Sequence, residues 1–398
     1  MNESLKYTCL FGGGAIRGVS YIGAIKYLEE LNIDISTLGG SSVGSIFATL
    51  LAVGYSADEM NHIFSGVNFN LFRDISIGIG PFFALSKGEV FLDWIRELIE
   101  KKYYGENYKK GQNNAVTFKD INKNLIIITT DLGNFECKEF SKEETPDFEI
   151  ASAIRISCCM PGLMKPIEYN NRLLVDGDLQ KSWPMWKLSP TLRYSKDRIL
   201  EFRLEGYYET TDLSGIDYAN AVYSCMTASS TSFVTDIYGN KDRYDYIVLN
   251  TGNIVIVDFN INDDKRKELI ESGYEQTKIY FKQALTKKKV KLREYYKIIY
   301  EHLTKIKKFI DSLKIAKAKV QLGDLYMELC DFCKYIDKID LKQINKFRDY
   351  FMQNIKYPSL FGRIKLNNEA LINAELSTVI TAINLKLNEY NEYLNKFS

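Results

Sequence analysis

The sequence predicts an α/β protein with a mostly parallel sheet, followed by an all-helical C-terminal extension. Up to about residue 285, short apolar stretches alternate with segments whose apolar residues recur at helical spacing. Strands that alternate with helices are typical of a parallel sheet covered on both faces. From residue 286 the strand signals fade, and helical patterns rich in Lys, Leu, Ile, Tyr and Asn continue to Ser398. We therefore predict two domains, 1–285 and 286–398.

The bulk properties are those of an ordinary globular protein. The 398 residues are 45% hydrophobic and 26% charged, with a formal net charge of +1, so the whole chain shows no preference for a polyanion. Seven scattered cysteines indicate a reduced, cytoplasmic chain rather than a disulfide framework. We expect no signal peptide, because the first strand begins at once, and no apolar run reaches the ~18–20 residues of a membrane span.

The first elements surround two glycine-rich turns. A short strand at Tyr7–Phe11 leads into Gly12-Gly13-Gly14, and a helix is predicted at Ile16–Leu31. A second apolar strand at Ile33–Leu38 precedes a helix at Val43–Val53. This helix is apolar nearly all round, which indicates that it is buried.

The remaining elements continue the alternation. Leu125–Leu132 is the clearest central strand. Asn68–Leu85 is predicted to be irregular, either a loop covering the core or part of an entrance for an acyl chain. The other predicted strands are Cys137–Phe140, Arg172–Val175, Ile199–Leu204 and Tyr246–Asn250, and the other helices are Val90–Lys102, Ile150–Cys159, a segment near Tyr218–Ile237, and Asp263–Ala284.

A G-x-S-x-G pentapeptide, residues 40–44, lies between a predicted strand and a predicted helix. Alone this motif is weak evidence, but its position is that of a nucleophile elbow. Gly40 and Gly44 are needed there because a Cβ would clash where the chain reverses. The turn would present the Ser42 hydroxyl at the edge of the sheet, where the helix N-terminus favours developing negative charge.

Asp176 is the better candidate for the base that such a serine needs. The chain has only two histidines, His62 and His302, and neither follows a strand, which argues against a Ser-His-Asp triad. Asp176 stands at the end of a strand and before a glycine, and ligands collect at the carboxyl ends of parallel strands. A carboxylate hydrogen-bonded to Ser42 could accept its proton.

The first glycine turn offers successive backbone N–H groups without side chains in the way. Gly12, Gly13 and Gly14 could therefore hold an oxyanion, and Arg17 could orient the loop or add positive charge. A nucleotide-binding loop is disfavoured, because G-x-G-x-x-G would need glycine at position 17 and no G-K-[ST] follows.

Three blocks, Gly12–Gly18, Gly40–Gly44 and Asp176-Gly177, in that order, resemble the signature blocks of the patatin-like phospholipases. The resemblance covers about residues 5–285. It implies a three-layer α/β/α fold, a dyad of Ser42 as nucleophile and Asp176 as base, and an oxyanion hole at Gly12–Gly14 with Arg17 in the loop's basic position. It also implies calcium-independent hydrolysis of lipid acyl esters through an acyl-enzyme.

This resemblance leads to the prediction of a lipid acyl hydrolase of phospholipase A or lysophospholipase type, acting on a phospholipid or another acyl-ester lipid without metal or cofactor. A catalytically silent lipid- or protein-binding module and an acyltransferase are the alternatives. The proton-acceptor motif departs from the family pattern, since Gly177 is followed by Asp178 where Gly or Ala is usual. This second carboxylate either perturbs the titration of Asp176 or faces solvent.

The extension begins with a strongly basic segment, because residues 286–319 hold twelve Lys and Arg against three acidic residues. One interpretation is a helical bundle with a solvated charged face, used for homo-oligomerisation. The other is a basic helix with interleaved tyrosines that makes peripheral contact with anionic membranes. No nucleic-acid-binding motif accompanies the charge, so nucleic acid is not expected as a partner.

Overall fold

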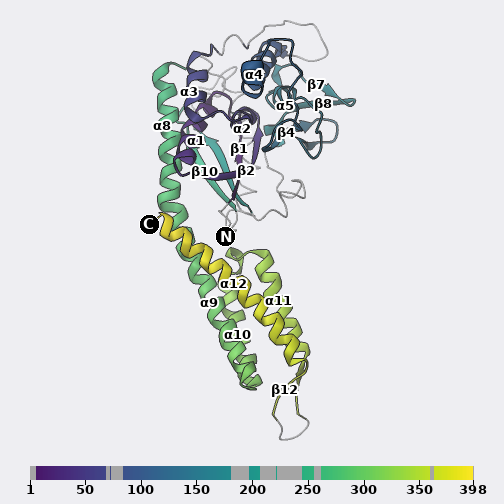
Figure 1. Cartoon of the computed structure of the whole chain (residues 1–398), viewed down its shortest axis with the longest axis vertical. Helices are drawn as coiled ribbons and strands as arrows, with labels where there is room; N and C mark the ends of the chain where they lie inside the picture. The colour runs from purple at the N-terminus through teal and green to yellow at the C-terminus, as the bar shows by residue number, and fades with distance from the viewer. Residues whose placement is uncertain are drawn as a thin grey trace. The chain divides into compact units, whose positions relative to one another are not determined.

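The structure is a computed structural model that describes residues 6–68, 72, 84–180, 197–206, 221, 244–254, 261–358 and 363–397 (Figure 1). It contains two compact units, of which one ends at Lys278 and the other continues from Ile279. Nearly all of the predicted loop Asn68–Leu85 and of the predicted helix near Tyr218–Ile237 lies outside the described residues.

The first unit is built on a mixed, mostly parallel sheet with the order β10-β9-β1-β2-β4-β8-β7, in which β5 also pairs with β4. The pairs from β10 through β9, β1 and β2 to β4 are parallel, whereas β5, β8 and β7 are joined by antiparallel pairs. The predicted fold class is confirmed. The strands are β1 Lys6–Phe11, β2 Asp34–Ser41, β4 Asn124–Asp131, β5 Glu136–Ser141, β7 Ile167–Tyr169, β8 Arg172–Asp176, β9 Arg198–Glu205 and β10 Tyr244–Asn250; a separate short pair is β3 Ala84–Ser86 with β6 Gly162–Met164.

The direction of β8 differs from the prediction for the strand that carries Asp176. β8 runs antiparallel to β4, so Asp176 is not at the carboxyl end of a parallel strand. Its position follows from register, because Asp176 pairs with Thr129 of β4, and the preceding β4 residue Ile128 pairs with Ser41 of β2. Two pairings across β4 therefore bring Asp176 level with the end of β2.

Helix α2 packs on β1, β2 and β4, and α5 packs on β4 and β8. The predicted helix Ile16–Leu31 is in fact a 3₁₀ turn, Ala15–Val19, followed by α1. A short helix, α3, was not predicted, and the predicted helix Asp263–Ala284 ends as a π-helical turn at Tyr280–Ala284. The helices of this unit are α1 Ser20–Glu30, α2 Val43–Val53, α3 Ala57–Gly66, α4 Glu89–Tyr104, α5 Ile150–Ser157 and α8 Asp263–Ile279.

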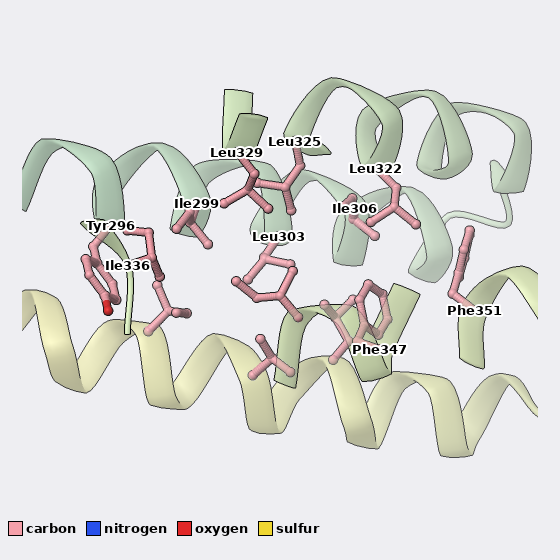
Figure 2. Close-up of a cluster of buried hydrophobic side chains, with 14 of the residues drawn as sticks. Tyr296, Ile299, Leu303, Ile306, Leu322, Leu325, Leu329, Ile336, Phe347 and Phe351 are labelled. Carbon is pink, nitrogen blue, oxygen red and sulfur yellow. The ribbon is translucent and has the colours of Figure 1, made fainter. Parts of the chain in front are cut away.

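The second unit is a set of helices around its own apolar core (Figure 2). On α9 the buried residues recur every three or four positions, as Tyr296, Ile299 and Leu303 show, so one face of the helix lies in the core. Phe347 and Phe351 of α11 fill the same core. The helices are α9 Leu285–Asp311, α10 Ile315–Phe332, α11 Lys338–Gln353 and α12 Glu369–Phe397, with a small hairpin of β11 Ile355–Lys356 and β12 Lys365–Leu366.

By length and composition alone, Glu369–Asn395 of α12 could cross a membrane. Core helices of globular proteins pass the same test, and Leu376, Val379 and Ile383 of α12 are buried in the core of the helical unit. Only 22% of the most apolar window of this helix is buried, however, and Leu371 and Leu385 are exposed.

Candidate active site

Ser42 occupies a sharp turn between β2 and α2. Its backbone has φ 49° and ψ −130°, a conformation that a non-glycine residue adopts at a cost and that is common at functional sites. The glycines on either side are explained by close contact. A Cβ at Gly40 would lie 2.3 Å from the Cα of Ser45, and one at Gly44 would lie 2.0 Å from the carbonyl oxygen of Phe11.

The Ser42 hydroxyl donates a hydrogen bond of 2.8 Å to Oδ2 of Asp176. Asp176 is fully buried, and its Oδ1 accepts a 2.8 Å bond from the N–H of Asp178. The backbone N–H of Asp176 donates to the carbonyl of Cys159. Gly177 allows this turn to lie against β4, because a Cβ there would be 2.3 Å from the carbonyl oxygen of Ile128.

Ser157, at the end of α5, also holds the serine turn. The N–H of Ser42 donates to Ser157 Oγ at 2.9 Å, and Ser157 in turn donates to the carbonyl of Ile128 at 2.6 Å. Ser157 was not among the predicted site residues. The signal that could have found it is a hydroxyl in the largely apolar segment at Ile150–Cys159.

The glycine loop lies beside the serine turn, because the missing side chain of Gly44 faces the carbonyls of Phe11 and Gly12. Two N–H groups of the loop have partners within the protein. Gly12 donates to the carbonyl of Phe202 at 3.1 Å, which continues the sheet, and Gly13 donates to Asp178 Oδ1 at 3.2 Å.

The Arg17 side chain bonds a segment far along the chain. Its Nε donates to the carbonyl of Ile254 at 2.7 Å, and the side chain is buried. Its observed contact ties the segment after the loop to the chain beyond β10. A role of Arg17 in orienting the loop therefore stays a prediction.

Tyr21 of α1 was not predicted as part of the site. Its hydroxyl donates a 2.7 Å bond to the carbonyl of Gly12, and the ring is fully buried. Burial, followed by the negative charges of Asp178 and Glu201, raises the pKa of Tyr21 well above its ordinary value. The phenol therefore stays protonated and keeps donating to the loop.

Cys158 adjoins the site without resembling a reactive thiol. Its Sγ lies 3.9 Å from Ser45 Oγ, and Ser45 donates to the carbonyl of Ser42. Burial, reinforced by the charge of Asp176, raises the pKa of Cys158 well above its ordinary value. Since the thiolate is the nucleophilic form, Cys158 is a poor nucleophile at neutral pH.

The two histidines lie elsewhere in the chain: His62 is exposed on α3, and His302 is on α9, where it bonds Gln321. Over the described part of the chain, no group of three or more His, Cys, Asp or Glu side chains could hold a metal ion.

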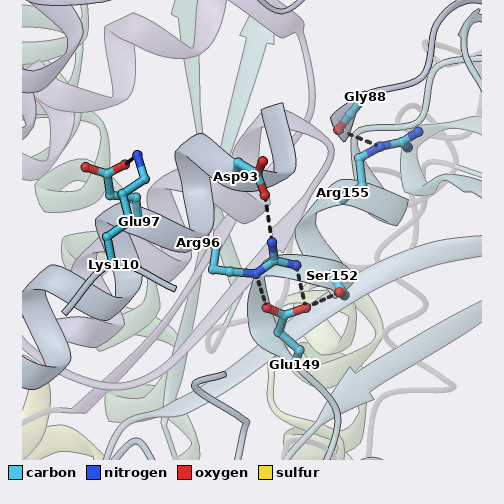
Figure 3. A network of polar contacts seen from close by, with 8 residues as sticks. All are labelled: Gly88, Asp93, Arg96, Glu97, Lys110, Glu149, Ser152 and Arg155. Atoms are coloured by element: carbon cyan, nitrogen blue, oxygen red, sulfur yellow. Dashed lines mark hydrogen bonds and ion pairs between the residues drawn. The ribbon is translucent and has the colours of Figure 1, made fainter. Parts of the chain in front are cut away.

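Helix α5, which supplies Ser157, is anchored by a buried arginine (Figure 3). Arg155 donates through Nε to the carbonyl of Gly88 at 3.1 Å, and through Nη2 to the carbonyls of Lys87 and Lys165. At the other end of the helix, Glu149 pairs with Arg96 of α4 at 2.6 Å. Helix α5 is therefore fastened at both ends.

Comparison with known proteins agrees with this architecture. Residues 10–184 match the family model of the patatin-like phospholipases. Uncharacterized protein R571 of Acanthamoeba polyphaga mimivirus is 29% identical over 289 residues, which is 70% of this chain and 94% of that protein. Probable lipid hydrolase 463L of Invertebrate iridescent virus 6 is 30% identical over 187 residues, 45% of this chain and 61% of that protein.

Lysophospholipase NTE1 of Cryptococcus neoformans is 28% identical over 183 residues, which is 45% of this chain but only 10% of that protein. The solved structure of VipD from Legionella pneumophila aligns with a TM-score of 0.51 at 16% identity, covering 94% of this chain and 90% of that chain. At this identity the likeness shows the fold alone. The predicted resemblance to the patatin-like phospholipase family is confirmed, and the family model matches over residues 10–184.

Proposed function

We propose that the protein hydrolyses acyl esters of lipids, as a phospholipase A or lysophospholipase, with Ser42 as nucleophile and Asp176 as base. The hydrogen bond from the Ser42 hydroxyl to the buried Asp176 carboxylate is the observation that carries this proposal. The family supports it, since relatives bear the names lipid hydrolase and lysophospholipase.

In the first half of the proposed reaction, Ser42 Oγ attacks the ester carbonyl carbon while Asp176 Oδ2 takes the hydroxyl proton. The carbonyl oxygen becomes an oxyanion beside the glycine loop and the N-terminus of α2, where N–H groups favour negative charge. The tetrahedral centre then collapses, the C–O ester bond breaks, and the leaving alcohol takes the proton from Asp176.

In the second half, water attacks the acyl-enzyme and gives a proton to Asp176. The fatty acid leaves, and the proton returns to Ser42 Oγ. Ser157 acts as a positioning residue in this scheme, since it holds the N–H of Ser42 and not the reacting atoms.

Two substitutions test the dyad: Ser42→Ala, which removes the nucleophile, and Asp176→Asn, which keeps the shape and removes the base. We expect each to lower fatty-acid release from phospholipid vesicles at least ~1,000-fold while the circular dichroism spectrum is unchanged. Full activity of either variant would refute the dyad.

Labelling by a fluorophosphonate separates this proposal from the silent binding module, because folded protein without a reactive Ser42 stays unlabelled. Acyl transfer would appear as a new ester when a competing alcohol is added.

For the basic segment we propose peripheral contact with anionic membranes, which rests on its exposed lysines. Lys297, Lys305 and Lys308 are exposed and recur at helical spacing on α9. Lys289, by contrast, is buried against the rings of Tyr390 and Tyr393, so it adds nothing to a surface field. Each exposed lysine near an anionic bilayer contributes up to about 1 kcal/mol.

Co-sedimentation of the full chain with phosphatidylserine vesicles tests this contact. We expect the triple change of Lys297, Lys305 and Lys308 to Gln to weaken binding about tenfold or more, and added salt to weaken wild-type binding. The matched control changes the exposed Lys109, Lys123 and Lys142 of the other unit to Gln. Equal losses in the two triple variants would contradict a specific role for α9.

A further inference from the structure

The carboxyl group of Asp178 lies directly on Gly13 in the glycine loop. Oδ1 accepts the Gly13 N–H at 3.2 Å. A Cβ at Gly13 would lie 1.9 Å from Oδ2 and 2.3 Å from Cγ, so this approach is possible only because residue 13 is glycine. The side chain of Asp178 is nearly completely buried, with 3% of the residue exposed.

The backbone of Asp178 is fixed by the base. Its N–H donates to Oδ1 of Asp176, whose Oδ2 accepts from Ser42. Gly177, between the two aspartates, packs against the carbonyl of Ile128. Asp178 therefore reaches Gly13 from the same tightly packed turn that carries the proposed base.

An oxyanion needs a backbone N–H donor, and the contact with Asp178 occupies the N–H of Gly13. The Gly12 N–H is already used by the sheet, through the carbonyl of Phe202, so Gly13 is the next donor along the loop. A carboxylate on that donor takes its hydrogen bond and places negative charge where negative charge has to develop in the transition state.

The loop has other supports that hold its shape. Tyr21 donates to the Gly12 carbonyl, the Gly12 N–H continues the sheet, and Arg17 ties the following turn to Ile254. These contacts fix the loop on both sides of Gly13 without Asp178. The bond from Gly13 is therefore better explained as occupation of a donor than as a tether.

We propose that Asp178 is an internal occupant of the oxyanion loop: its carboxylate holds the Gly13 N–H in the resting protein and is displaced when the carbonyl oxygen of an acyl ester takes this donor. The inference rests on the proposed hydrolase function. It gives Asp178 a restraining role, and it predicts that the resting protein is less active than its dyad alone would allow.

Three forms of the full chain test this restraint: wild type, Asp178→Asn and Asp178→Ala. Asn keeps an oxygen that can accept from Gly13 but removes the charge, whereas Ala removes both. With p-nitrophenyl butyrate we expect kcat to rise about threefold or more for Asn and about tenfold or more for Ala, with a smaller change in KM. The second-order rate of Ser42 labelling by a fluorophosphonate should rise in the same order.

Asp147→Asn, an exposed aspartate of the same unit, is the matched control and should leave both rates unchanged. Lower rates in both folded Asp178 variants, or rates equal to wild type, would overturn the inference and leave the dyad intact. Absence of Ser42-dependent labelling in all forms would instead reject the proposed function. Thermal unfolding identifies a variant that has lost its fold. If Asp178→Ala does not fold, the rates of the near-isosteric Asp178→Asn variant test the inference.

Discussion

At Gly44 the start of α2 touches the end of β1 with no room for a side chain. A methyl group there would meet two backbone carbonyls, Phe11 at 2.0 Å and Gly12 at 2.6 Å, and backbone cannot move aside as a flexible side chain can. The same contact sets the distance between the serine turn and the glycine loop. The residue is therefore important to both folding and site geometry.

Gly44→Ala should lower the free energy of unfolding by about 1–3 kcal/mol and slow the labelling of Ser42, because the loop is pushed away from the serine. Urea unfolding and fluorophosphonate labelling measure the two effects. Gly66→Ala is the control, since a Cβ at Gly66 meets nothing within 4 Å. Equal stability of the two variants would contradict the close approach of Gly44 to the carbonyls of Phe11 and Gly12.

Ser157 accepts from the Ser42 N–H and is itself fully buried. Ser157→Ala leaves that N–H and the Ile128 carbonyl without this partner, so we expect a loss of about 1–3 kcal/mol and a lower kcat. Denaturant titration and ester hydrolysis measure these changes. Ser152→Ala, on the same helix but bonded to Glu149, should leave kcat unchanged.

The thiols should react with iodoacetamide in an order set by exposure and by pKa. Cys158 is half-buried, and its raised pKa keeps it neutral at pH 8, because the pH is still below that pKa, whereas Cys330 and Cys333 are exposed. Peptide mass spectrometry should find Cys330 and Cys333 alkylated in native protein, and Cys158 only after unfolding. Early alkylation of Cys158 would show that the site is more open than described.

Among the elements, α5 depends on the contacts of Arg155. This guanidinium donates to three backbone carbonyls of two other segments, and the residue is 2% exposed (Figure 3). The pair of Arg96 with Glu149 is partly exposed to solvent, which weakens an ion pair. The two arginines therefore stabilise the same helix to different degrees.

Arg155→Ala should lower the free energy of unfolding by about 3 kcal/mol or more, since buried carbonyls lose charged donors. Arg96→Ala should cost about 1 kcal/mol or less. Equilibrium unfolding of the two variants tests this difference. A reversed order would mean that the partly exposed Arg96–Glu149 pair, and not the buried guanidinium of Arg155, stabilises α5 more.

Local patterns of the sequence were sufficient to predict most strands and both glycine turns. Gly40, Ser42 and Gly44 lie within five residues, so their geometry is a local property. The direction of β8 could not be predicted, because an apolar run identifies a strand but not its partner. The bond between Ser157 and the Ser42 N–H likewise joins segments that only the folded sheet brings together, as does the 3.5 Å bond from the Tyr21 hydroxyl to the Phe202 carbonyl.

For the whole molecule, the two units have separate cores. Phe347 lies in the core of the helical unit, which contains only residues from α9 onward. The sequence predicted the change from alternating strands and helices to helices alone near residue 285, because amino-acid composition differs between helices and strands. Composition could not show that Lys289 is buried, because its burial depends on packing against Tyr390 and Tyr393 of α12.

Phe347→Ala should destabilise the helical unit by about 3–5 kcal/mol through a cavity. Calorimetry should show the transition of that unit at lower temperature, while Ser42 is labelled at the wild-type rate at 25 °C. Met327→Ala, with Met327 73% exposed on α10, should change neither. Slower labelling in the folded Phe347→Ala protein would show that the two units are coupled.

The pairing of β8 with β4 restricts how this chain can change in length. Successive side chains of a strand face opposite sides of the sheet, so a one-residue deletion between Arg172 and Asp176 would turn the carboxylate to the far face. A two-residue deletion would restore the face but move the residue by roughly 7 Å along the strand. The turn before β8 is equally constrained, because Asn170 and Asn171 both have positive φ in a two-residue hairpin. Insertions and deletions are therefore not expected to be tolerated in the ten residues that lead from Ile167 to the aspartate.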